Sequence, residues 1–165
     1  MIIFREYFEN FTNNLIFFIK FIPLLLAISI FIWIFEYLNY GFDFTDEGYY
    51  IVWIANPFEY KASASQFGFI YHPLYLLVGE DLVYLRKLDM IITFFLSLIL
   101  SYLVINKILP KNKIGWLKSI FFTTGISINV FLNYNISTPN YNSLTLQGLM
   151  IVLIGLLIIE SKINK

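Results

Sequence analysis

The chain has 165 residues, of which 59% are hydrophobic and only 13% charged, and its formal net charge at pH 7 is zero. Soluble domains carry about 25% charged residues, so this composition excludes an ordinary soluble globule and predicts an integral membrane protein. The balanced charge argues against a nucleic-acid partner, which needs a basic face, and a chain with one histidine and no cysteine excludes disulfides and multi-histidine metal clusters.

Four apolar segments predict an all-α fold that crosses the membrane four times. The first segment covers residues 15–35, and about 20 apolar residues suffice to span the hydrocarbon of a bilayer. The other three cover residues 82–105, 117–133 and 142–159, and Asp81 is expected to cap the helix of the first of these three. Residues 1–165 are expected to form a single membrane domain.

A long connection at residues 36–81 separates the first two predicted spans and contains seven of the acidic residues. Thr45 is a plausible N-cap for a short apolar helix at Tyr49–Ala55, which Asn56 and Pro57 would end. A second short helix or turn is expected to begin at His72 and Pro73 and to run to Val78. Both elements are too short to span, so they are predicted to lie in the membrane interface.

The distribution of lysine predicts the orientation of the chain. The connection at residues 106–118 contains four lysines and the C-terminus two more, whereas the other two connections contain only Lys61. Because lysine and arginine concentrate in cytoplasmic connections, the N-terminus, the basic connection and the C-terminus are expected in the cytoplasm. The acidic connection and the Asn-rich turn at residues 133–142 are then expected on the outer side.

Two adjacent acids, Asp46 and Glu47, are the strongest candidates for chemistry. At the start of a helix they are favoured by the helix dipole, and this purely structural role explains their residue type. Alternatively, one carboxylate accepts a proton from an acceptor hydroxyl, or binds a metal, at the membrane surface. Neighbouring residues on a helix point in different directions, so at most one of the two can face a given substrate atom.

The order of short motifs around these acids resembles a known family. The motifs are Asp46-Glu47-Gly48-Tyr49-Tyr50, Gly68-Phe69-Ile70-Tyr71-His72-Pro73-Leu74, a Gly79-Glu80 turn, and Arg86 at the start of the next span. Together they resemble the N-terminal part of the GT-C membrane glycosyltransferases, in the branch similar to protein O-mannosyltransferases and lipid A aminoarabinose transferases. The family's membrane core has more than four spans, so the resemblance implies either an incomplete module that a further membrane segment or subunit completes, or a reduced relative of the family.

The resemblance implies a transferase that moves a sugar from a polyprenyl-phosphate donor to a lipid, glycan or protein acceptor by an inverting displacement. Asp46 then corresponds to the catalytic carboxylate, and Glu47 to the accompanying acid, which supports the site or holds a divalent metal. Arg86 or His72 would face the donor phosphate, and Tyr49 and Tyr50 would contact the substrate. We expect such a protein in a bacterial or archaeal cytoplasmic membrane, in contact with membrane lipid.

Other interpretations of the same residues remain open at this point. Arg86 also suits an ion pair with Asp89 one turn away, and His72 also suits a hydrogen-bonded place in the interface. The tyrosines are also typical of the aromatic belt of a membrane protein. The chain as a whole could be a non-catalytic membrane subunit or an inactive fragment. A transporter piece is disfavoured, because no predicted span carries an acid at its centre.

Overall fold

The computed structural model describes residues 22, 25–26, 28–41, 46–59, 65–108 and 137–163. All regular elements among these residues are helices, which agrees with the predicted all-α class. In chain order they are a first helix at Ile28–Tyr37, α2 at Asp46–Ala55, the 3-10 helix η1 at Pro57–Glu59, α3 at Phe67–Leu77, α4 at Leu82–Ile108 and α6 at Tyr141–Ile163.

Two of these helices, α4 and α6, are long and apolar enough to cross a membrane. With 27 residues, α4 is roughly 40 Å long, which exceeds the bilayer hydrocarbon of about 30 Å. They contain the predicted spans 82–105 and 142–159 and extend slightly beyond them. The first helix continues two residues past the predicted end at residue 35. The predicted span 117–133, most of residues 15–27 and the Thr45 cap lie outside the described residues.

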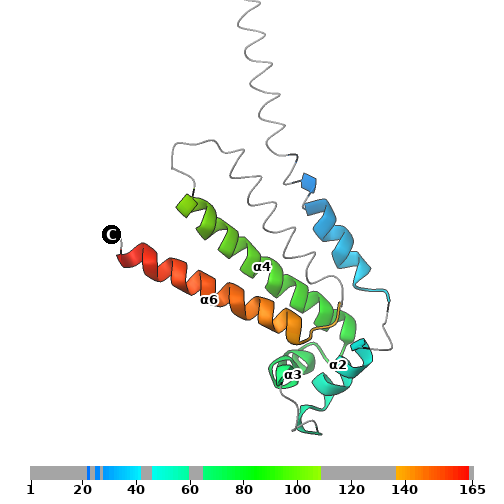
Figure 1. The fold of residues 1–165 in the computed structure, drawn as a ribbon. Helices are drawn as coiled ribbons and strands as arrows, with labels where there is room; N and C mark the ends of the chain where they lie inside the picture. The colour runs from blue at the N-terminus through cyan, green and yellow to red at the C-terminus, as the bar shows by residue number, and fades with distance from the viewer. Residues whose placement is uncertain are drawn as a thin grey trace, which may run out of the picture.

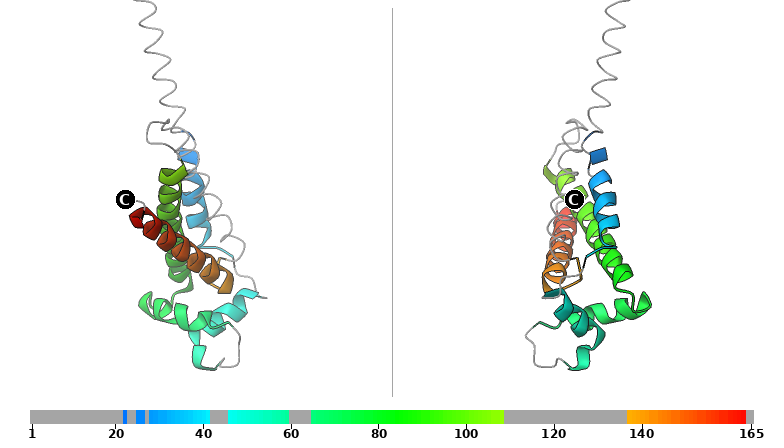
Figure 2. Two further views of the ribbon diagram at one scale, coloured as in Figure 1. Left: turned by 60° about the vertical axis from the view of Figure 1, so that its left-hand side comes forward. Right: turned by 90° about the vertical axis from the view of Figure 1, so that its right-hand side faces the viewer.

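The two long helices lie side by side, and α2 and α3 pack together across one end of the pair (Figure 1; Figure 2). Along α4, the side chains that face inward are small and polar at every fourth residue, namely Thr93, Ser97 and Ser101. They allow α6 to approach closely, and Met150 of α6 is buried against Ser97. Small polar contact residues of this kind are typical of helix pairs in membranes.

Side chains cap the helices at the end where α2 and α3 lie. Asp81 begins α4, and its Oδ1 accepts hydrogen bonds from the backbone N–H of Val83 at 2.8 Å and of Tyr84 at 3.1 Å. The sequence predicts this cap, and the structure confirms it. Asn140 and Ser143 form a reciprocal cap on α6, because each side chain accepts a hydrogen bond from the backbone N–H of the other.

The predicted start of α3 at His72 is wrong, because the helix begins five residues earlier at Phe67 and carries Pro73 in its interior. Pro73 removes one backbone hydrogen bond from the helix. Burial of one helix face offsets this loss: Phe67, Gly68 and Tyr71 are all buried against α2. The indole of Trp53 packs 4.8 Å from the Phe67 ring, centroid to centroid, and forms the centre of this contact.

Gly68 provides a test of the packing between α2 and α3. A Cβ at this position would lie 2.9 Å from the Trp53 carbonyl oxygen and would also collide with the indole ring. We therefore expect Gly68→Ala to destabilise the protein by about 1–3 kcal/mol, as overpacking typically does. Gly148→Ala in α6 is the matched control, since its Cβ meets nothing within 4 Å. Unfolding of both variants in detergent micelles measures the difference, and equal stabilities would contradict the described packing.

Candidate functional site

The two adjacent acids of α2 have opposite environments. Glu47 is 3% exposed and points inward, whereas Asp46, one residue earlier, is exposed. The separation arises because successive residues of an α-helix lie about 100° apart around its axis. The pair thus consists of one carboxylate enclosed by protein and one open to a ligand.

Glu47 is enclosed by three donors from distant parts of the chain. Its Oε1 lies 2.6 Å from Nη2 of Arg86 in an ion pair whose two side chains are at most 4% exposed. The hydroxyl of Ser137 donates to the same oxygen at 3.1 Å, and the hydroxyl of Thr138 donates to it as well. The start of α2 is therefore tied both to α4 and to the turn that precedes α6.

Arg86 uses all three of its nitrogens in contacts with the protein. Besides the ion pair, Nε donates to Oγ1 of Thr138 at 3.1 Å, and Nη1 donates to the carbonyls of Leu38 at 3.4 Å and Gly41 at 3.1 Å. At 2% exposure, the guanidinium offers no face to a ligand. Arg86 thus pairs with Glu47 and not with Asp89, the alternative partner one turn along α4. Asp89 accepts a 2.7 Å hydrogen bond from Nε2 of Gln147 on α6.

His72 joins α3 to the last turn of α2. Its Nδ1 lies 2.8 Å from the carbonyl oxygen of Ile54, and the ring is half-buried edge-on to Phe58. Because a carbonyl can only accept, Nδ1 carries the hydrogen of this hydrogen bond. The hydrogen-bonded ring that the sequence left open for His72 is thus the arrangement observed.

The candidate tyrosines also divide into one exposed and one buried ring. Tyr49 is 49% exposed and lies on the same helix face as Asp46, three residues earlier. Tyr50 is buried, edge-on to Phe67 and to Tyr141 at the start of α6. Burial, a hydrogen bond with Tyr141 and the negative charge of Asp46 raise the pKa of Tyr50 to about 12. Tyr50 is therefore a neutral phenol at physiological pH.

A buried polar network fixes α3 against α4 and α6. The Tyr71 hydroxyl lies 3.1 Å from the Ser143 hydroxyl and donates to Oε1 of Gln147 at 3.3 Å. Nε2 of Gln147 also donates to Oγ1 of Thr93 at 3.0 Å. Burial, and then the nearby Asp89 carboxylate, raise the pKa of Tyr71, so its phenol stays protonated. Tyr71, the residue before His72, is thereby held in place.

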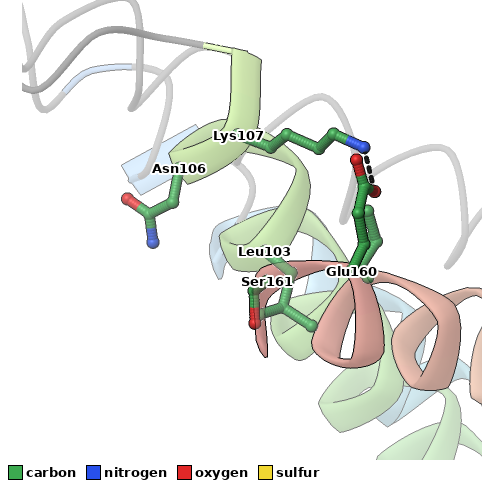
Figure 3. A pocket seen from close by; sticks show the side chains of 6 residues that line it. Leu103, Asn106, Lys107, Glu160 and Ser161 are labelled. Carbon is green, nitrogen blue, oxygen red and sulfur yellow. Dashed lines mark hydrogen bonds and ion pairs between the residues drawn. The ribbon is translucent and has the colours of Figure 1, made fainter. Parts of the chain in front are cut away.

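A second ion pair joins the far ends of α4 and α6. Lys107 and Glu160 bond there beside a groove of about 220 Å³ that is lined by Leu103, Asn106, Leu157 and Ser161 (Figure 3). Both charged side chains are about half exposed, at 51% and 47%. Water screens such a pair, so it contributes little to stability compared with the buried pair of Glu47 and Arg86. It is therefore a useful control for the buried pair.

The chemistry available at the acidic end is that of one exposed carboxylate beside aromatic rings. Within the part of the chain that the structure describes, no group of three or more histidine or acidic side chains gathers to hold a metal ion. Sequence reasoning missed Ser137 and Thr138, in the turn before α6, and Tyr141, the first residue of α6. Comparison of the chain with protein family models, curated proteins and solved structures found no match.

Proposed function

We propose that this chain is a membrane glycosyltransferase of the GT-C kind, acting alone or with a further membrane subunit. It transfers a sugar from a polyprenyl-phosphate donor, with Asp46 as the base. The observation that carries this proposal is the division of the two acids. Glu47 is anchored by Arg86, Ser137 and Thr138, while its neighbour Asp46 is exposed on a helix whose start is thereby fixed.

The proposed step is a single displacement at the anomeric carbon of the donor sugar. A hydroxyl of the acceptor attacks this carbon while its proton passes to a carboxylate oxygen of Asp46. The bond between the anomeric carbon and the phosphate oxygen breaks, and polyprenyl phosphate leaves with the electron pair. The donor already carries an activated leaving group, so the protein supplies one base and a fixed geometry.

The surroundings of Asp46 suit this role. The positive-inside rule predicts that α2 lies on the outer side of the membrane, the side on which the proposed transfer occurs. Tyr49 lies on the same face of α2 as Asp46 and offers an exposed ring to an incoming substrate. Glu47 and Arg86 act by positioning: they neutralise one another inside the protein and hold the first turn of α2 in place.

Transfer by the wild-type chain tests the function itself. Membranes that contain the chain are incubated with a radiolabelled mannosyl polyprenyl phosphate and a lipid extract as acceptor. We expect labelled product with the opposite anomeric configuration to the donor, because a single displacement inverts the centre. Membranes without the chain are the control. Product of retained configuration would contradict the proposed step, and absence of any chain-dependent product would favour a non-catalytic subunit.

A further inference from the structure

We infer that Lys87 binds the phosphate group of a lipid at the outer end of α4. This inference deepens the proposed function, on which it rests for the identity of the lipid as a polyprenyl-phosphate donor. A basic side chain that binds phosphate must be able to reach it. Arg86, the residue that the sequence first suggests, is enclosed and saturated by protein acceptors. Lys87 is the other basic residue in the first turns of α4, and it is half-buried rather than enclosed.

The ammonium of Lys87 lies among aromatic rings. Its Nζ is 5.3 Å from the centroid of the Phe35 ring and 6.0 Å from that of Tyr84. Ring faces attract a cation without cancelling its formal charge. Among the described residues, no carboxylate lies within ion-pair distance of Lys87. The ammonium thus keeps its capacity for an anion, and the rings limit the directions in which it can point.

The position of Lys87 suits a phosphate that is attached to a membrane lipid. It lies six residues after the Asp81 cap, near the end of a helix long enough to span the bilayer. If α4 spans the bilayer, its first turns meet the headgroup region, where a lysine attracts lipid phosphates. Lys87 also follows Arg86, whose ion-pair partner Glu47 follows Asp46. The proposed base and the proposed phosphate site are therefore each one residue away from the same buried ion pair.

Thermal unfolding in phosphatidylcholine nanodiscs tests the inference without requiring turnover. The added probes are undecaprenyl phosphate, undecaprenol of the same chain length, phosphatidic acid and inorganic phosphate. We expect undecaprenyl phosphate to raise the Tm of the wild type and undecaprenol to leave it unchanged, because ligands that bind only the folded state stabilise it. Lys87→Gln should lose this shift, whereas Lys87→Arg and the control Lys107→Gln should keep it.

The outcomes separate the possible sources of the phosphate. If phosphatidic acid raises the Tm as much as undecaprenyl phosphate does, and Lys87→Gln abolishes both shifts, the site binds lipid phosphate in general. If inorganic phosphate raises the Tm equally, the lipid chain is not needed for binding. A shift that survives in Lys87→Gln, or no phosphate-dependent shift in the wild type, overturns the inference. A Lys87-dependent shift in a chain that transfers no sugar would contradict the proposed function and leave the phosphate site standing.

Discussion

Replacing Glu47 by glutamine is expected to destabilise the protein by about 3–5 kcal/mol, the cost of breaking a buried ion pair. The loss is large because Arg86 is 2% exposed and would keep its charge without a counter-ion. Glutamine can still accept hydrogen bonds from Ser137 and Thr138 through its amide oxygen. The expected loss therefore comes from the charge and not from the shape of the side chain.

Arg86→Met should cost a similar amount, because it leaves the Glu47 carboxylate buried without its cation. It also removes the donors to the carbonyls of Leu38 and Gly41. The double variant Glu47→Leu with Arg86→Met should cost less than the sum of the single variants, since neither charge remains. The double variant should still be less stable than the wild type, because the carbonyls of Leu38 and Gly41 lose their hydrogen-bond donor.

Unfolding by denaturant or heat in detergent micelles measures these differences. The control is Glu160→Gln, which breaks the exposed pair with Lys107 and should cost at most about 1 kcal/mol. If Glu47→Gln and Glu160→Gln proved equally stable, the buried ion pair would not anchor α2. The positioning role that we assign to Glu47 would then have no basis.

The sequence predicted those parts of the fold that have a local signature. Long apolar runs predicted α4 and α6, and the Asn56-Pro57 stop predicted the end of α2 at Ala55. Asp81 predicted the start of α4. The local signal for the start of α3 pointed to the wrong residue. A proline favours a helix start, but the helix begins six residues before Pro73, where Phe67 and Tyr71 are buried.

The site depends on contacts that leave no local signature. Thr138 reaches Glu47 across 91 residues, and the acceptors of Nη1 of Arg86 are backbone carbonyls, which any residue could supply. Sequence reasoning recognised that Asp46 and Glu47 could not both face one substrate atom. It could not show which of the two is exposed, because that depends on where α4 and the turn before α6 pack against α2.

Replacing Asp46 by asparagine is expected to reduce sugar transfer by about 100- to 10,000-fold while leaving the protein folded and inserted. Asparagine has nearly the same size and also favours a helix start, so a residue that only caps α2 would tolerate the change. It cannot accept the proton of the acceptor hydroxyl, and general-base catalysis typically contributes a factor of this size. The exposed position of Asp46 makes a large loss of stability unexpected.

Glu59→Gln is the matched control for this substitution, because Glu59 is another exposed acid close to the end of α2, in η1. It removes the same charge from the same part of the chain and should leave transfer unchanged. This comparison separates loss of the proposed base from a general change in the acidity of the surface.

The most direct measurement is the rate of transfer of labelled sugar from the polyprenyl-phosphate donor by wild type, Asp46→Asn and Glu59→Gln in membranes at matched protein levels. Asp46 as the base predicts that wild type and Glu59→Gln transfer at equal rates and that Asp46→Asn loses at least about 100-fold. Transfer by Asp46→Asn at the rate of an active wild type would contradict the account.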